Sequence, residues 1–244
     1  MFWRKFKLDW TYAIGELLIV TLGVLVALGI QQWNEDRLEK IEEKEILERL
    51  LIDLDVDRDN LELQISAAIA KEESLNRLEP VFASGQPPAD ASEFLNDVVI
   101  GANYGWNQSG PRIRTFEEIL SSGKFGLIRD AGLRNAISGY YGTFNALLAR
   151  ADARETEYPH ISYRLIPRSR ESDRQGALLD AELAGVVDEN SKKVVDTVLK
   201  SEIGDYVIAE RNLALFLLRT SADVMEQRQA LVTQIQGYRQ SLEN

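Results

Sequence analysis

The sequence predicts an all-α protein, with one N-terminal transmembrane helix that continues into a long stalk helix and an extramembrane helical bundle. Three observations predict this: an apolar run near the N-terminus, a long stretch with helical spacing of apolar residues, and no run that alternates like a β-strand. The composition, 45% hydrophobic and 27% charged, is typical of globular proteins. We expect a short basic tail over 1–11, the transmembrane helix over 12–33 and the bundle over 34–244.

The apolar run is long enough to cross a bilayer. Residues 17–30 read LLIVTLGVLVALGI, and Thr21 is the one polar side chain among them. Extension back to Tyr12 gives about 28 Å of helix, close to the ~30 Å hydrocarbon core. Trp10 and Trp33 flank the run, as aromatic residues do at both membrane interfaces.

A cleaved signal peptide is the alternative interpretation of this run. Arg4, Lys5 and Lys7 form a basic start, and Ala27-Leu28-Gly29 resembles a cleavage site. Because the sequence includes Met1, we expect an uncleaved anchor. Lysine and arginine counts tie across the run, and the acidic flank that follows it favours a cytoplasmic N-terminus. We therefore expect a bacterial inner (cytoplasmic) membrane protein with a periplasmic C-terminal domain.

Three residues of the run predict contact with another membrane helix. Glu16 lies about one turn inside it, and charge in lipid usually faces protein, although a carboxylate near the edge can also extend to the headgroups. Gly23 and Ala27 form a small-xxx-small pair that permits close helix approach. We expect Glu16, Gly23 and Ala27 to be the membrane helix contact.

The remainder of the chain reads as helices joined by short loops. We expect a first helix over 35–79, a loop over 80–92 and further helices near 92–102, 115–123, 130–154, 188–200 and 204–242. Asp130 is a predicted N-cap and Gly123 a predicted C-cap. The first and last helices are expected to pair antiparallel. The predicted seam of the first is Leu47, Leu51, Leu54, Arg58, Leu61, Ile65, Ala68, Glu72 and Leu75.

Residues for catalysis or metal binding are scarce. The chain has no cysteine and one histidine, His160. The alternating residues Asp53, Asp55, Asp57 and Asp59 lack the glycine and glutamate of a calcium loop, so we interpret them as a solvated acidic helix face. We expect no catalytic residue, no cofactor and no metal site. The net charge of −11 argues against nucleic acid and against anionic lipid surfaces as partners.

Aromatic and basic clusters in the soluble part are possible interface residues. They are Trp106, Tyr104, Arg164, Arg168 and Arg170. The aromatic residues also fit a protein core, and the arginines also fit pairing with the chain's own carboxylates.

Two blocks of sequence resemble one known family. YAIGELLIVTLGVLVALGIQQWNEDR (12–37) has a Gly-Glu-aliphatic run that exits through Trp-Asn-Glu. TFEEILSSGKFGLI (115–128) and LRNAISGYY (133–141) form a helix–SSG–aliphatic turn before a Tyr-Tyr helix. Both resemble a family of uncharacterised bacterial single-pass membrane proteins, a domain of unknown function. The resemblance implies a membrane-anchored helical domain and supplies no catalytic residue or cofactor.

Two hypotheses of function follow, and an enzyme is a distant third. The first is a non-catalytic accessory or structural subunit that packs against integral membrane subunits of a larger complex, with respiratory or photosynthetic energy-transducing assemblies as the host class considered. The second is a membrane-anchored, sensor-like, ligand-binding helical bundle. The second requires a separate signalling partner, because about 11 residues precede the apolar run.

Overall fold

The computed structural model describes residues 10–103, 110–166 and 189–242, and every regular element in these ranges is a helix. This confirms the all-α class. The elements are α1 (Trp10–Ser84), α2 (Ala91–Gly101), α3 (Arg114–Ser121), the short 3₁₀ helix η1 (Lys124–Leu127), α4 (Ala131–Asp152), α5 (Tyr158–Leu165), α8 (Glu189–Leu199) and α9 (Ile203–Ser241).

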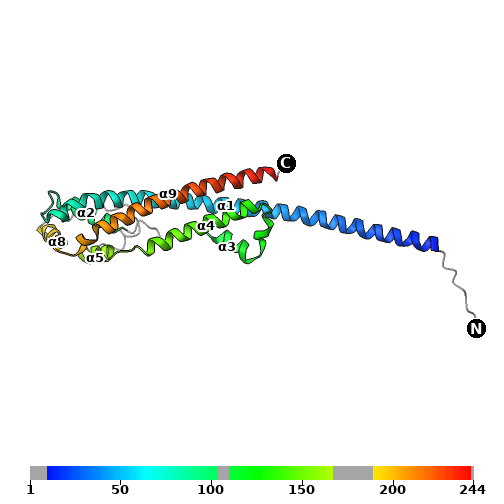
Figure 1. The fold of residues 1–244 in the computed structure, drawn as a ribbon, viewed down its shortest axis with the longest axis horizontal. Coiled ribbons are helices and arrows are strands. Elements are labelled where there is room, and N and C mark those ends of the chain that lie inside the picture. Colours follow the sequence, from blue (N-terminus) through cyan, green and yellow to red (C-terminus); the bar gives the residue numbers. More distant parts are fainter. Residues whose placement is uncertain (1–9, 104–109, 167–188, 243–244) are drawn as a thin grey trace, which may run out of the picture.

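Helix α1 is one uninterrupted helix of 75 residues, which corresponds to about 112 Å at 1.5 Å per residue. Its N-terminal part projects away from the bundle, and its C-terminal part runs the length of the bundle beside α9 (Figure 1). The apolar run therefore continues into the bundle helix without a break, as the sequence predicts. One 18-residue window near the start of α1 has mean hydropathy 1.6 and none of it is buried, so this helix is long and apolar enough to cross a membrane.

The predicted loop at 80–92 begins too early. Helix α1 passes through Pro80 and ends at Ser84, and Gly85, with a φ of 64°, follows it. Proline removes one backbone hydrogen bond from the helix. However, Leu78, two residues before Pro80, and Phe82, two residues after it, pack in an apolar cluster that holds the last turn in place. Tertiary packing thus overrides a local helix breaker.

Helices α1 and α9 pair antiparallel, as the sequence predicts. Buried residues recur in steps of four and three along both helices, which is the spacing of a coiled-coil seam. In α1 they include Glu43, Leu47, Leu50, Leu54, Asp57, Leu61, Gln64, Ala68, Lys71, Leu75 and Leu78. In α9 they include Ile203, Val207, Glu210, Ala214, Leu217, Ser221, Val224, Arg228, Leu231 and Ile235.

Two large apolar clusters fill the bundle at different heights along this seam. The first joins α1 to α3, α4 and the end of α9, nearer the projecting helix. The second joins the end of α1 to α2, α5, α8 and the start of α9. A smaller cluster around Ala68 and Leu217 lies between them. The stretch of α1 between the two large clusters is also where Gln64 and Lys71 are buried.

Local signals fix the shorter helices. The Asp90 carboxylate accepts hydrogen bonds from the backbone N–H groups of Ser92 (2.8 Å) and Glu93 (3.1 Å). The Asp130 carboxylate accepts one from Leu133 (2.7 Å), which confirms the predicted N-cap of α4. Gly123, with a φ of 74°, follows the end of α3 as predicted and turns the chain into η1.

Candidate functional site

The three predicted membrane-contact residues lie on one side of α1. At 100° per residue, Glu16, Gly23 and Ala27 fall within about 40° of each other around the helix axis. All three are exposed, and a Cβ added at Gly23 would meet nothing within 4 Å. The hydroxyl of Thr21 donates instead to its own helix, at Leu17 O (2.7 Å). This side of the apolar run is therefore open to a neighbour.

The same side of α1 stays exposed where the helix runs along the bundle. Four large aliphatic residues lie there, roughly opposite the buried seam: Leu38, Ile41, Ile52 and Leu63, which are 43–60% exposed. We call the set Glu16, Gly23, Ala27, Leu38, Ile41, Ile52 and Leu63 the outer face of α1. It begins in the apolar run and extends up the bundle, although single exposed aliphatic residues are common on any protein.

The structure describes one of the predicted interface residues of the soluble part. Arg164 is exposed at the end of α5 and lies 3.6 Å from the Glu202 carboxylate. Tyr104, Trp106, Arg168 and Arg170 lie outside the described residues. No grouping of these five residues can therefore be drawn from the structure.

Sequence reasoning missed a ladder of buried polar residues in α1. Every seventh residue from Glu43 is buried: Glu43, Leu50, Asp57, Gln64, Lys71 and Leu78. The predicted seam had Leu47, Leu54, Leu61, Ala68 and Leu75 right, but its other stripe, Leu51, Arg58, Ile65 and Glu72, is half-buried. The second stripe was placed one residue late. Both stripes have seven-residue spacing and each mixes apolar or uncharged positions with charged ones, so the spacing alone does not distinguish them.

The prediction that the four alternating aspartates of α1 form one solvated acidic face is wrong. Asp55 and Asp59 are exposed, but Asp53 and Asp57 are buried. The carboxylate of Asp57 accepts hydrogen bonds from the N–H of Arg112 (2.7 Å) and the hydroxyl of Tyr140 (2.9 Å). These donors offset the cost of burying the charge.

Burial dominates the electrostatics around Asp57. It raises the pKa of the Asp57 carboxyl above its ordinary value, against the two hydrogen bonds, which lower it. It also raises the pKa of the hydroxyls of Tyr140 and Tyr141, and the negative charge of Asp57 adds to that shift. Both tyrosines therefore stay protonated at neutral pH, and Tyr140 remains a hydrogen-bond donor.

Lys71 and Glu210 form an ion pair between α1 and α9 that is almost fully buried. Their side chains are 2% and 1% exposed. The ammonium also donates to Asn103 O (3.2 Å), and the Thr156 hydroxyl donates to the second carboxylate oxygen of Glu210. Burial lowers the pKa of Lys71, and the charge of Glu210 opposes that shift. The pair therefore connects α1 and α9 with two further segments of the chain, at Asn103 and at Thr156.

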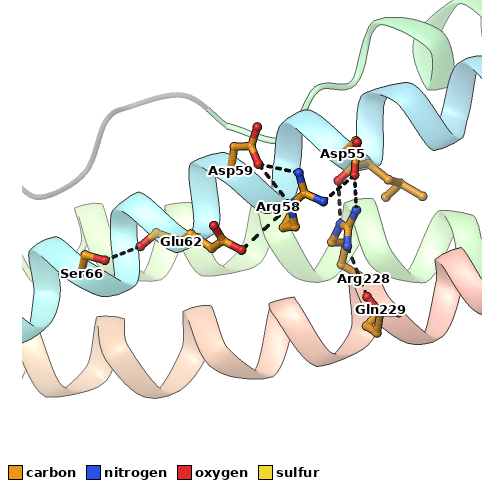
Figure 2. A network of polar contacts seen from close by, with 8 residues as sticks. Asp55, Arg58, Asp59, Glu62, Ser66, Arg228 and Gln229 are labelled. Carbon is orange, nitrogen blue, oxygen red and sulfur yellow. Dashed lines mark hydrogen bonds and ion pairs between the residues drawn. The ribbon is translucent and has the colours of Figure 1, made fainter.

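Arg228 links α9 to the backbone and the acidic surface of α1 (Figure 2). Its buried guanidinium donates to Leu54 O (2.6 Å) and to the Asp55 carboxylate (3.1 Å). Asp55 also pairs with Arg58 (3.0 Å), which reaches Asp59 as well (2.9 Å). The exposed part of this network has little effect on stability, whereas the buried arginine fixes the register of the two helices.

One rung of the ladder has no partner. Gln64 is 4% exposed, and neither its amide nitrogen nor its oxygen has a hydrogen-bond partner in the described part of the chain. The antiparallel register places it near Leu217, an apolar residue of α9. An unsatisfied buried amide costs about 1–3 kcal/mol, so Gln64 lowers the stability of the seam at this height.

The described residues contain no group of three or more histidine or acidic side chains that could hold a metal ion. Lys71 and Glu210 pair with each other, and the carboxylate of Asp57 accepts hydrogen bonds from uncharged donors. What the arrangement does is position helices: the ladder fixes which α1 residue meets which α9 residue and limits how tightly the seam packs.

A protein-family comparison bears on the two sequence blocks. A model described as "Family of unknown function (DUF6090)" matches residues 16–154. The chain belongs to this family. The DUF6090 match covers most of α1, the turn at Gly123 and the Tyr140–Tyr141 pair, so both blocks lie largely within it. No curated protein and no solved structure matches this DUF6090 member.

Proposed function

We propose that this protein is a non-catalytic accessory subunit, anchored in a membrane by the start of α1, that packs against integral membrane subunits of a larger complex. The observation that carries the proposal is the outer face of α1. A charged residue and two small residues share one side of an otherwise apolar helix, and exposed aliphatic residues continue that side along the bundle.

Membrane physics explains why this face suits a protein partner. A carboxylate such as Glu16 is costly in hydrocarbon unless it contacts protein or reaches the headgroups. Gly23 and Ala27 let a second helix approach closely, and such packing drives association where lipid tails are as apolar as leucine. The bundle lies roughly on the other side of α1, so it does not obstruct the partner.

The proposal includes an orientation: the N-terminus in the cytoplasm and the bundle in the periplasm of a bacterial cell. Lysine and arginine counts tie on the two sides of the apolar run, so they do not oppose this orientation, and a long domain is exported largely regardless of its charge. Reporter fusions after residue 242 test it. An enzyme that works only after export should be active there, and activity of a cytoplasm-dependent reporter would refute the orientation.

Membrane attachment itself has a direct test. The full-length protein should sediment with membranes from gently lysed cells and should resist extraction with high salt or alkali. Recovery of the intact chain in the supernatant would contradict the anchor.

Matched glycine variants test the partner contact. Gly23 and Gly29 both lie in the apolar run with open space around them, but Gly29 lies about 140° from Glu16 around the axis. In mild detergent, the full-length protein should run in a complex larger than itself or its dimer. Gly23→Leu should release it from that complex, and Gly29→Leu should not. A protein that always runs alone or as a homodimer would refute the proposal.

The polar ladder favours the sensor-like bundle as a second candidate. The buried amide of Gln64 has no hydrogen-bond partner in the described residues, which lowers the stability of the seam, and α1 is continuous with the membrane helix. A ligand that binds the bundle would then act on the apolar run through α1. Thermal-shift screening of the full-length protein with metabolites tests this, and the absence of any stabilising compound would contradict it.

A further inference from the structure

A groove lies where α1 enters the bundle. It has a volume of about 570 Å³ and lies between α1, the residue before the N-cap of α4, and the end of α9. We call it the juxtamembrane groove, and its lining is Trp33, Asp36, Arg37, Lys40, Ile41, Lys44, Arg129 and Leu242. Four of these eight side chains are basic in a chain whose net charge is −11.

The basic side chains of α1 in this groove occupy one side of the helix. Trp33, Arg37, Lys40 and Lys44 follow each other in steps of four, three and four, so they fall within about 60° around the axis. Arg37, Lys40 and Lys44 make no ion pair or hydrogen bond within the described residues. Three cations thus face one concave surface without a protein partner there.

The neighbouring carboxylates of α1 are held on another side of the helix. Glu39 pairs with Arg129 (3.2 Å) and Glu42 with Lys124 (2.5 Å). The buried carboxylate of Glu43 accepts from the Tyr238 hydroxyl (2.7 Å) and the Arg129 N–H (2.8 Å). Glu39 and Glu42 are therefore neutralised by ion pairs within the bundle, and Glu43 is buried.

One carboxylate does line the groove. Asp36 lies 3.9 Å from the Arg129 guanidinium, which it shares with Glu39. Arg129 is therefore already neutralised, and the remaining positive charge of the groove comes from the three unpaired cations of α1. The net negative charge of the chain repels anions, but at physiological salt this repulsion is screened beyond about 8 Å. The local cations therefore decide whether an anion binds in the groove.

The groove also lies at the correct height for a lipid headgroup. If the apolar run spans the bilayer, Trp33 lies at the interface. Arg37, Lys40 and Lys44 follow about 6, 10 and 16 Å further along the axis. The headgroup layer is about 5–7 Å thick on each side. Side chains of an α-helix tilt toward its N-terminus, which here is toward the membrane, so the side chains of Arg37 and Lys40 extend back to the phosphates, whereas Lys44 lies beyond contact distance.

We propose that the juxtamembrane groove binds the phosphodiester headgroup of an anionic phospholipid, with Arg37 and Lys40 contacting the phosphate and Trp33 packing against the glycerol region. This inference rests on the membrane anchor proposed above. It adds a ligand class and a site that the anchor alone does not require, because an apolar helix inserts equally into zwitterionic lipid.

Lipid titration of the full-length protein in detergent tests the site, with bound lipids counted by native mass spectrometry. Phosphatidylglycerol should bind in preference to phosphatidylcholine. Each removed contacting cation should weaken phosphatidylglycerol binding about fivefold, so R37Q/K40Q should lose about 25-fold. The charge-preserving variant R37K/K40R should retain binding. Equal phosphatidylglycerol affinity in the glutamine variant and the unmodified protein would overturn the proposal.

Control variants and a second probe complete the experiment. K192Q/K193Q removes two exposed cations of α8, at the far end of the bundle, and should leave lipid binding unchanged. A loss equal to that of R37Q/K40Q would mean unspecific charge attraction and would refute the site. Inorganic phosphate at millimolar concentration should not displace phosphatidylglycerol. Displacement would identify a free phosphate site and would overturn the lipid assignment.

The two proposals fail separately. If the full-length protein leaves the membrane pellet, the anchor fails and the lipid site fails with it. If it stays in the pellet but shows no preference for phosphatidylglycerol, the anchor stands and the juxtamembrane groove is not a headgroup site. Circular dichroism of each variant confirms that the helices are retained.

Discussion

Replacement of Lys71 by methionine would leave the Glu210 carboxylate buried in the bundle without its opposite charge. Loss of one partner of a buried ion pair typically costs about 3–5 kcal/mol. Two features of the structure place the expected loss near the lower end, at about 3 kcal/mol. Methionine nearly fills the volume of lysine, so little cavity forms, and Glu210 keeps the hydrogen bond from Thr156.

The double variant K71M/E210L separates the pair from the packing. With both charges removed, the seam gains an apolar layer, and the stability should return to within about 1 kcal/mol of the unmodified protein or exceed it. E210L alone should cost a similar amount, because it leaves the Lys71 ammonium buried without its opposite charge. The coupling, which is the sum of the two single costs minus the cost of the double variant, should therefore be about 5–6 kcal/mol. Urea denaturation of the full-length protein in detergent, followed by helical circular dichroism, gives all four free energies of unfolding.

Two results would refute this reasoning. A cost below about 1 kcal/mol for K71M would show that water reaches Glu210. Single-variant costs that simply add in the double variant would show that Lys71 and Glu210 act on stability independently, despite their contact.

Three further predictions use the same denaturation assay. Burial raises the pKa of Asp57, so the folded state binds a proton there more readily than the unfolded chain, and the unmodified protein should gain stability relative to D57N as pH falls from neutral toward 3.8. D130A removes the N-cap of α4 and should cost about 1 kcal/mol. G101A should cost about 1–3 kcal/mol, because the new Cβ would lie 2.8 Å from the buried Leu75 side chain, whereas G142A, an exposed helical position with open space, should gain about 0.5–1 kcal/mol.

Each of these has a result that would contradict it. A constant difference between the unmodified protein and D57N across the acidic range would mean that residue 57 titrates alike in both states. D130N serves as the control for the cap, because asparagine caps a helix as well as aspartate does. Equal effects of G101A and G142A would show that Leu75 moves aside without cost.

The sequence was informative where one periodicity dominates. The apolar run, the continuous α1, the antiparallel pairing of α1 with α9 and the cap at Asp130 all follow from local spacing and residue type. The end of α1 did not, because Phe82 packs on a cluster formed by residues distant in the chain and so carries the helix past Pro80. Local propensity contains no information about that contact.

The polar ladder was missed for a related reason. Whether Asp57 or Lys71 is buried depends on partners far away in the chain, such as Tyr140 and Glu210, and no local pattern reports them. The outer face of α1 could be predicted in part: Glu16, Gly23 and Ala27 were identified from the sequence, whereas its extension up the bundle required knowledge of which side of α1 faces α9.

The pairing of α1 with α9 also determines when this protein can fold. During translation α1 leaves the ribosome first. Its main partner, α9, is made last, after every other described helix. Until then, the leucines of α1 that face α9 stay exposed in the nascent chain, and exposed apolar surface of this kind favours aggregation. Termination before residue 203 would leave this stripe of α1 without its partner helix.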